Sequence, residues 1–490
     1  MSDPSETSDK QMEVQRHGTM YLLSSAGITA VGFLATMFYA HWVGAGILGQ
    51  YFLFLSCYNL VSLFTDMGIG MAGVQRMCGG TDPDAYFTAS ISMRMGIFGI
   101  LTVIFVLFHN ISVFQKFFGD LNSTGLFWLL ILTLGIGTFQ SSISMALGPS
   151  NRLGLAAASS FLDNIARIII QVVSVFLGFQ VYGLIGGLIA GLLVEIIIFS
   201  RYIDYHLKKF QWSHVKNIFS FSTWIFLSTV CTVLFDNLNP LIIAIFLPVS
   251  EVGIFGVCWT FSIFALFVST AICNTLFVKV SRWHASGETN AIVLALSRAT
   301  TYSLIFSLPI LAGGFFISKD LLYYLYGASF AAGATVLIVI IGARVIQSIL
   351  QLYTYFLLAT NHARIAFTSS ITGTFVNIIL SIILIPKIGL IGAAIGSLAN
   401  VFISFIICLY YIHGFIPLII ETTPILHILE ATAGMACVLE LILLLPISKS
   451  AVITILLVIA GAVIYFSILI IMDEQIRADA VRTLKIKWLQ

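Results

Sequence analysis

Apolar runs about as long as a bilayer is thick follow one another along almost the whole chain. From His17 to Thr65 there is no Lys, Arg, Asp or Glu, and one transmembrane helix needs about 20 apolar residues. That stretch alone predicts two spans. The complete pattern predicts fourteen helices, at residues 20–43, 47–73, 86–108, 124–147, 154–178, 181–203, 218–247, 251–278, 291–317, 332–359, 363–385, 388–412, 424–446 and 450–472. We therefore expect an all-α, polytopic membrane protein.

Prolines mark where these helices end or bend. Two of them, Pro240 and Pro309, fall inside predicted spans. A proline removes a backbone hydrogen bond, so both helices should be kinked there. Four others lie where turns are expected: Pro149, Pro248, Pro386 and Pro446.

Cations concentrate on one side of the predicted membrane. With the N-terminus placed in the cytoplasm, fifteen fall on that side: Lys10, Arg16, Arg76, Arg152, Arg201, Lys208, Lys209, Lys216, Lys279, Arg282, Arg364, Arg477, Arg482, Lys485 and Lys487. Four fall on the other: Lys116, Lys319, Lys387 and Lys449. Because Lys and Arg are enriched in cytoplasmic loops, we expect a cell (plasma or inner) membrane protein with both termini in the cytoplasm.

Composition excludes several classes of function. Of the 490 residues, 59% are hydrophobic and 9% are charged, and the mean hydropathy of +1.04 excludes a soluble globular protein. The net charge of +2 comes from scattered cations, which argues against a nucleic-acid partner. The seven cysteines form no CxxC pair and predict no metal site or cofactor. No predicted loop exceeds about 20 residues, too few for a catalytic domain, so we do not expect an enzyme.

Two parts of the chain resemble each other at a spacing of about 205 residues. Shifting residues 147–169 by 210 places lays Asn151 on Asn361 and aligns two further Ser–Ser and Ile–Ile pairs. The sequence YGLIGG at 182–187 likewise matches IGLIGA at 388–393. The match predicts an internal duplication of a six-helix unit.

A repeat with an even number of helices inserts both copies in the same orientation, as in some alternating-access carriers. LGQY at 48–51 lies 204 residues before VGIF at 252–255, which supports the same spacing. Small residues after Gly389 should let helix backbones approach closely. We expect five parts: a cytoplasmic tail at 1–17, an N-lobe at 18–212, a C-lobe at 213–418, two extra helices at 419–472 and a cytoplasmic tail at 473–490.

Eight charged side chains lie within predicted spans: Arg94, Arg167, Arg298, Arg344, Asp66, Asp163, Glu195 and Asp236. Each would cost about 2.5–3.5 kcal/mol at the bilayer centre, so we expect them to face a hydrated cavity or one another. Arg94 and Arg298 are 204 residues apart and hence equivalent in the repeat, and both are close enough to a helix end to snorkel. Arg344 lies near the middle of its span and is the best candidate for lining a cavity.

The acidic residues have two interpretations each. Asp163 and Arg167 share a helix face at a spacing of four, which favours a neutralising pair. Asp66 either takes part in gating or caps a loosened backbone in TDMGIG. Glu195 and Asp236 either carry a coupling proton or cation or play a structural part. The four acids are our candidates for coupling or gating.

The assembled segments resemble the polysaccharide/oligosaccharide flippase family of the multidrug/oligosaccharidyl-lipid/polysaccharide exporter superfamily, from Gly18 to about Met472. The likeness rests on LGQYFLFLSCYNLVSLFTDMGIGMAGVQR (48–76), FDNLNPLIIAIFLPVSEVGIFG (235–256), LLYYLYGASFAAGATVL (321–337), and LATNHARIAF with VNIILSIILIPKIGLIGAAIGS (358–397). It implies two six-helix lobes that open in turn to either side. It also implies that cavity cations hold the phosphate and sugar of a lipid-linked oligosaccharide. Arg94, Arg298 and Arg344 suit that part, and Arg167 completes the predicted substrate-binding set.

The resemblance predicts a flippase that moves a polyprenyl- or dolichyl-(pyro)phosphate-linked oligosaccharide to the outer leaflet. The alternatives are a flippase for the peptidoglycan lipid precursor, a cation-coupled multidrug exporter and, last, a membrane glycosyltransferase or polymerase. Membrane lipids are the expected surroundings. We expect a monomer that works near glycosyltransferases or a polymerase, with Na⁺ or H⁺ as the candidate coupling ion.

Overall fold

The computed structural model of the chain describes residues 4–79, 82–108, 125–147, 153–203, 205–417, 421–445, 450–474 and 476–478. These ranges contain helices and no strand, as an all-α protein requires. Several predicted features lie outside them: Lys116, Pro149, Asn151, Arg152, Pro446, Lys449, and the part of the C-terminal tail that holds Arg482, Lys485 and Lys487.

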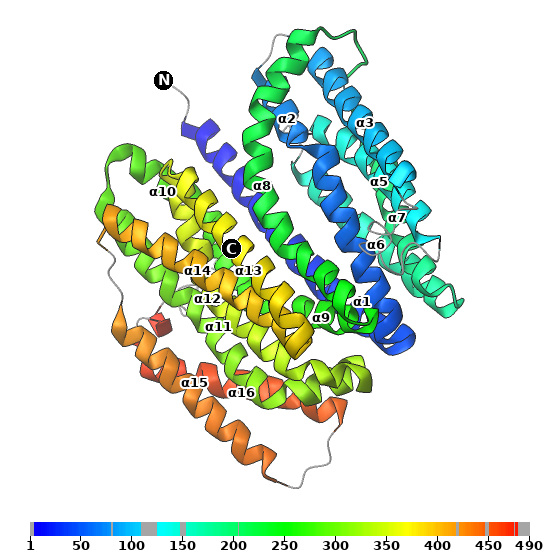
Figure 1. Cartoon of the computed structure of the whole chain (residues 1–490). Coiled ribbons are helices and arrows are strands. Elements are labelled where there is room, and N and C mark those ends of the chain that lie inside the picture. The colour runs from blue at the N-terminus through cyan, green and yellow to red at the C-terminus, as the bar shows by residue number, and fades with distance from the viewer. Residues whose placement is uncertain are drawn as a thin grey trace. The chain divides into compact units, whose positions relative to one another are not determined.

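The chain divides into two compact units, Met1–Gly253 and Ile254–Gln490. Unit 1 contains α1 (Pro4–Asp66), α2 (Ile69–Gly79), α3 (Pro83–Phe108), α5 (Leu126–Ser144), η2 (Met145–Leu147), α6 (Leu153–Phe176), α7 (Gln180–Ser200), α8 (Trp212–Phe246) and the start of α9 (Val249–Ser262) (Figure 1). Unit 2 contains the rest of α9, η3 (Ile263–Leu266), α10 (Phe267–Ser286), α11 (Thr289–Tyr326), η4 (Ala328–Gly333), α12 (Ala334–Ala359), α13 (Ala363–Ile388), α14 (Leu390–Phe415), α15 (Thr422–Leu443) and α16 (Ala451–Met472).

The first helix is longer than the sequence predicts. α1 runs for 63 residues and contains one non-helical residue, Gly44, with φ 74° and ψ 177°. Glycine has no Cβ and takes this conformation without strain, so the chain bends at this one residue and the helix resumes directly after it. The expected loop between residues 43 and 47 is therefore a kink, and the predicted N-terminal tail belongs to α1 from Pro4 onwards.

Within the described residues, 13 helical segments are long and apolar enough to cross a membrane. The sequence predicts fourteen, and the two counts differ because α1 covers the first predicted span and most of the second. Pro240 lies inside α8 and Pro309 inside α11, as predicted. Pro386 lies in the last turn of α13, just before Gly389, where a φ of 65° separates α13 from α14.

The units differ from the predicted lobes at α8. The sequence assigns residues 213–418 to the C-lobe, whereas α8 packs on α1, α2 and α3 and so lies in unit 1. The lobes as bounded by the sequence stay a prediction. In unit 2, α15 and α16 pack on each other and on α11.

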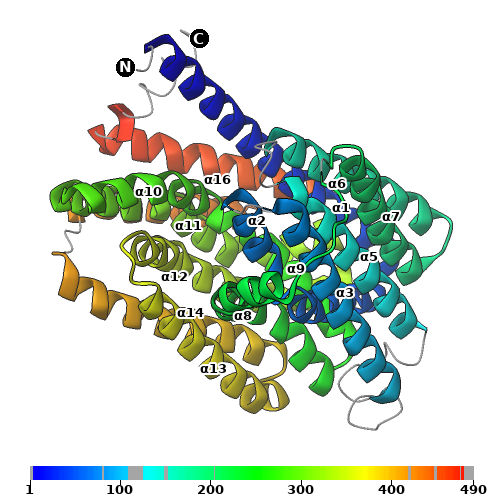
Figure 2. The same ribbon diagram turned by 90° about the horizontal axis from the view of Figure 1, so that it is seen from above.

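α13 and α14 lie side by side in both views and contact each other through a matched set of small and polar residues (Figures 1 and 2). Each helix carries glycine, asparagine and serine at spacings of four, at 373, 377 and 381 on α13 and at 396, 400 and 404 on α14. A Cβ on Gly396 would lie 2.6 Å from Asn377 Oδ1, and one on Gly373 would lie 2.5 Å from Asn400 Oδ1. Each glycine thus accommodates the asparagine of its partner, which confirms the predicted close approach.

Candidate functional site

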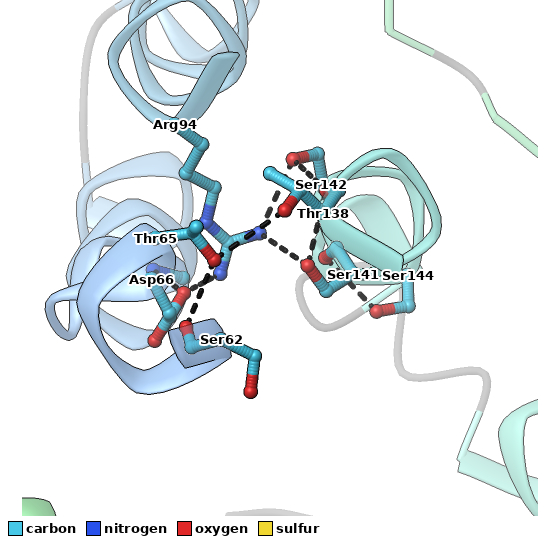
Figure 3. A network of polar contacts seen from close by, with 9 residues as sticks. Ser62, Thr65, Asp66, Arg94, Thr138, Ser141, Ser142 and Ser144 are labelled. Atoms are coloured by element: carbon cyan, nitrogen blue, oxygen red, sulfur yellow. Dashed lines mark hydrogen bonds and ion pairs between the residues drawn. The ribbon is translucent and has the colours of Figure 1, made fainter. Parts of the chain in front are cut away.

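Arg94 is the centre of a buried polar network in unit 1. It lies on α3 and is 3% exposed. Its guanidinium pairs with Asp66 at the end of α1, and its Nη1 donates to Ser141 Oγ at 3.5 Å and Ser142 Oγ at 3.4 Å on α5 (Figure 3). Two helices, α1 and α5, therefore supply its partners, and the charge of Arg94 is neutralised inside unit 1.

A break in the helix positions Asp66 for this pairing. Met67 and Gly68 have φ values of 43° and 73°, so α1 ends at Asp66 and α2 begins at Ile69. The Gly70 N–H of the first turn of α2 donates to Asp66 Oδ1 at 3.3 Å, which caps the new helix. A Cβ at Gly70 would lie 2.1 Å from Arg94 Nη2, so any larger residue there would displace the guanidinium. Of the two interpretations of Asp66, the geometry favours the cap, joined with a charge partner.

Arg298 lies in a different environment from its repeat equivalent. It is exposed on α11 and makes no hydrogen bond or ion pair with the other residues that the structure describes. Residue 270, which is 204 places after Asp66, is a threonine. Gln351 Nε2 donates to the Thr270 hydroxyl at 3.3 Å. At the positions of the Asp66–Arg94 pair, unit 2 thus holds Thr270 and Arg298, and Thr270 pairs with Gln351 instead.

Arg344 is nearly buried in unit 2, at 3% exposed. Its guanidinium carbon lies 4.0 Å from the ring centroid of Trp259. Its Nε donates to Ser262 Oγ at 3.0 Å, and its Nη1 donates to Gln347 Oε1 at 2.6 Å. The stacking and the two hydrogen bonds hold the side chain between α12 and α9.

A second charged cluster lies on α6 and α7 of unit 1. Asp163 and Arg167 are half-buried on α6, and Arg167 donates to Asn164. Glu195 of α7 is 8% exposed. Its carboxylate accepts from Gln140 and, at 3.2 Å, from Ser160 Oγ. The structure therefore gathers Asp163, Arg167 and Glu195 in one region of unit 1.

Gly191 makes room for this cluster, because a Cβ there would lie 2.0 Å from Asp163 Oδ1. The equivalent positions of unit 2, 210 places later, are Gly373 for Asp163 and Asn377 for Arg167. The charged interface of unit 1 thus corresponds to the neutral α13–α14 interface of unit 2. The packing of these two helices does not require the charges, because unit 2 packs the equivalent helices without them.

Asp236 is separate from these groups, exposed on α8 four residues before Pro240. Next to it, Asn237 Oδ1 accepts from Asn59 Nδ2 of α1 at 2.9 Å.

Gln171 is a buried polar residue that sequence reasoning missed. Gln171 is 2% exposed on α6. It accepts from the Tyr39 hydroxyl at 2.9 Å and donates to the Tyr51 hydroxyl at 3.0 Å and to the Leu184 carbonyl at 2.7 Å. Its place four residues after Arg167, on the same helix face, is the sequence signal that points to it.

Unit 2 also contains an apolar pocket of about 220 Å³ between α11, α12, α15 and α16. Pro309 lines it at the kink of α11, and Met435, Leu439 and Tyr465 line it from the last two helices. Its walls are almost entirely hydrocarbon, so an aliphatic chain is the ligand that they suit. Among the described residues, no three His, Cys, Asp or Glu side chains gather as metal ligands would.

Comparison with known families gives a match over most of the chain. Residues 46–335 match the family described as "Polysaccharide biosynthesis protein". The Haloferax volcanii protein "Probable low-salt glycan biosynthesis flippase Agl15" is 24% identical over 405 residues, which are 83% of this chain and 84% of that protein. The "Probable flippase AglR" of the same organism is 25% identical over 466 residues, 92% of this chain and 94% of that protein.

Solved structures show the same fold. The "Lipid II flippase MurJ, inward closed conformation" aligns with a TM-score of 0.76 at 16% identity, over 92% of this chain and 98% of that one. An inward-facing multidrug resistance MATE family transporter of the MOP superfamily aligns with a TM-score of 0.60 at 15% identity, over 78% and 93%. The chain is thus an all-α, multi-pass membrane protein with a transporter fold.

Proposed function

The chain belongs to the polysaccharide biosynthesis protein family, and from this we propose that it is a flippase for a lipid-linked oligosaccharide. It carries a polyprenyl- or dolichyl-(pyro)phosphate-linked glycan from the cytoplasmic to the outer leaflet by alternating access. The observation that carries the proposal is the family match, together with two flippase-named relatives that align with more than four-fifths of the chain. The protein acts as a transporter and not as an enzyme.

Arg298 is the residue we assign to the phosphate of the substrate. A guanidinium binds phosphate oxygens through two parallel hydrogen bonds, and such bonds are strong because both partners are charged. Arg298 is exposed and makes no hydrogen bond or ion pair within the described part of the chain, so its donors are available to a ligand. Arg94 and Arg344 are buried among protein partners. We assign them, with Arg167, to holding each unit in shape beside the substrate path.

The lipid part of the substrate needs an apolar environment. The pocket between α11, α12, α15 and α16 offers one, and each CH₂ group that leaves water there contributes about 0.8 kcal/mol. A prenyl segment in this pocket keeps the tail beside unit 2 while the head group crosses. Arg298 and Pro309 lie on the same helix, α11, so one helix supplies both a cation and an apolar wall.

Glu195 and Asp163 are the residues we assign to coupling. Two carboxylates share a region with a single arginine, so the cluster has one negative charge in excess when both are ionised. A proton or a Na⁺ ion would compensate that charge and could link a cation gradient to transport. Asp236, exposed beside the kink of α8, remains a gating candidate, whereas Asp66 is assigned to Arg94.

The cellular location and the neighbouring proteins follow from the proposed flippase function. The protein works as a monomer in the cell membrane with both termini in the cytoplasm, near the glycosyltransferases or the polymerase that make or use the glycan.

A binding experiment tests the substrate assignment. The purified protein in nanodiscs is titrated with a lipid-linked oligosaccharide, the same lipid phosphate without sugar, and the free prenol, and bound lipid is counted by native mass spectrometry. We expect affinity to fall in that order, and equal retention of all three lipids would contradict the proposal.

A further inference from the structure

Two glycines of unit 1 let two helices touch backbone to backbone. Gly49 lies on α1 and Gly253 on α9. A Cβ on Gly49 would lie 2.0 Å from the carbonyl oxygen of Val249, and a Cβ on Gly253 would lie 2.2 Å from that of Ala45. Real Cβ atoms do not come this close to an oxygen, so neither position accepts a side chain unless the helices separate. We call segments 45–49 and 249–253 the glycine seam.

The two contacts of the seam join equivalent positions of the two copies of the repeat. Gly253 is the equivalent of Gly49 at a spacing of 204 residues, and Val249 is the equivalent of Ala45 at the same spacing. Each glycine therefore lies against the carbonyl of the residue four places before its equivalent. Such a pattern, in which i contacts j and j contacts i, is the mark of a twofold axis. A local twofold axis thus relates the two segments of the glycine seam.

The breaks that precede the two segments are equivalent as well. Gly44, with its φ of 74°, bends α1 immediately before Ala45, and Pro248 precedes the start of α9 at Val249. Positions 44 and 248 are again 204 residues apart. Each segment thus begins at a bend and reaches the other one turn later. The duplication has kept this geometry with different residues at the bends, which indicates that the close approach itself matters.

The glycine seam leaves no room for water between its two backbones. Ala45, Gly49 and Gly253 are buried, whereas Gly46 is exposed and a methyl group added to it would have no neighbouring atom within 4 Å. Backbones that approach this closely are held by van der Waals packing and Cα–H···O contacts, which are individually weak. The contact is therefore tight enough to close a path and weak enough to part.

We propose that the glycine seam is the closed side of the transport path, and that it separates once in each transport cycle. The proposal rests on the proposed function, because alternating access requires one side to be closed while the other is open. Gly49 and Gly253 are positioning residues: they contact no substrate, but they set how closely the two equivalent segments approach. Both segments lie within unit 1, so the movement involves the start of α9 against α1.

A labelling experiment tests the seam directly. Ala45→Cys places a thiol at a buried seam position, and its reaction with a maleimide is followed by peptide mass spectrometry, so the native cysteines stay in place. Adding Gly253→Ala inserts a methyl group where there is no room, which should favour the separated state and raise the labelling rate about fivefold or more. The matched control, Gly46→Ala, should leave the rate unchanged. An unchanged rate in Gly253→Ala would overturn the proposal.

Two internal checks keep the result clear. Native Cys57, 2% exposed in the same unit, must stay unlabelled, which separates opening of the seam from unfolding. Should Gly253→Ala fail to fold, Gly49→Ala with a Val252→Cys reporter tests the contact from its other half. The labelling needs no glycolipid, so it stands apart from the substrate assignment. A seam that opens in a protein that moves no glycolipid would reject the proposed function and keep the seam.

Discussion

Arg94 and Arg298 occupy equivalent positions of the repeat, 204 residues apart, yet the first is buried against Asp66 and the second is exposed. The difference follows from one position, because residue 270 is a threonine where the first copy has Asp66. Without the acid, Thr270 pairs with Gln351 and leaves Arg298 outside that pair. The two equivalent arginines thus differ in their surroundings: Arg94 is paired within unit 1, whereas Arg298 makes no hydrogen bond or ion pair with the described residues.

Replacing Asp66 should destabilise the protein. Asp66→Asn leaves the buried guanidinium of Arg94 without a counter-charge. Because the Asp66 side chain is 41% exposed, the cost should be about 1–3 kcal/mol, below that of a fully buried pair. Thermal unfolding in detergent measures the loss. The double variant Asp66→Asn/Arg94→Gln should lose less than the sum of the two single variants, and strict additivity would contradict the pairing.

Replacing Arg298 should affect transport without affecting folding. Arg298→Ala removes the guanidinium we assign to phosphate, and a lost charge-assisted hydrogen-bond pair should reduce initial transport about tenfold or more. Its thermal unfolding should match that of the unsubstituted protein, because Arg298 makes no hydrogen bond or ion pair with the described residues. Arg298→Lys keeps the charge but loses the planar guanidinium that makes two parallel hydrogen bonds. Its transport rate should lie between those of Arg298→Ala and the unsubstituted protein. Wild-type transport by Arg298→Ala would exclude the assignment.

The α13–α14 interface should not accept a methyl group. Gly396→Ala would place a Cβ 2.5 Å from Ser381 Oγ and 2.6 Å from Asn377 Oδ1. We expect a loss of about 1–3 kcal/mol in unfolding free energy, as in overpacked cores. Gly414→Ala, on the same helix with no atom within 4 Å, is the control and should change little. Equal effects of the two substitutions would show that the close approach does not stabilise unit 2.

Glu195 should determine the response to a cation gradient. Glu195→Gln keeps the shape of the side chain and can still hydrogen-bond Gln140 and Ser160, but it cannot bind or release a proton. We expect transport without a gradient to continue and its acceleration by an imposed Na⁺ or H⁺ gradient to disappear. The measurement compares initial rates with and without each gradient in vesicles. Full acceleration in Glu195→Gln would remove this residue from coupling.

The helices and the repeat could be predicted from the sequence because apolar length and small-residue spacing are local signals. The same signals could not show that α1 continues through Gly44, because a glycine can either end a helix or only bend it. They also say nothing of the packing of α8 against α1, α2 and α3, because those contacts join residues distant in sequence. Local pattern therefore predicts which helices exist better than which neighbours they take.

The charged residues stand out in the sequence because they interrupt apolar runs, but their surroundings depend on partners distant in sequence. Asp163 and Arg167 share one helix face, which led to the prediction of a neutralising pair, but the hydrogen bond of Arg167 goes to Asn164. The stacking of Arg344 on Trp259 could not, because the ring belongs to another helix. Gln171 was missed because an uncharged amide does not stand out in an apolar run, although its two tyrosine partners bury it fully.

We propose above all that the protein moves a phosphate-linked glycan across a bilayer. The most direct measurement reconstitutes it in vesicles that contain a labelled lipid-linked oligosaccharide and follows the fraction of glycan that a sugar-cleaving enzyme can reach from one side. With the protein, the reachable fraction should rise from one leaflet's share towards the total, and with Arg298→Ala it should rise about tenfold more slowly. A reachable fraction that stays at one leaflet's share, in vesicles holding folded protein, would show that the protein does not move the glycan.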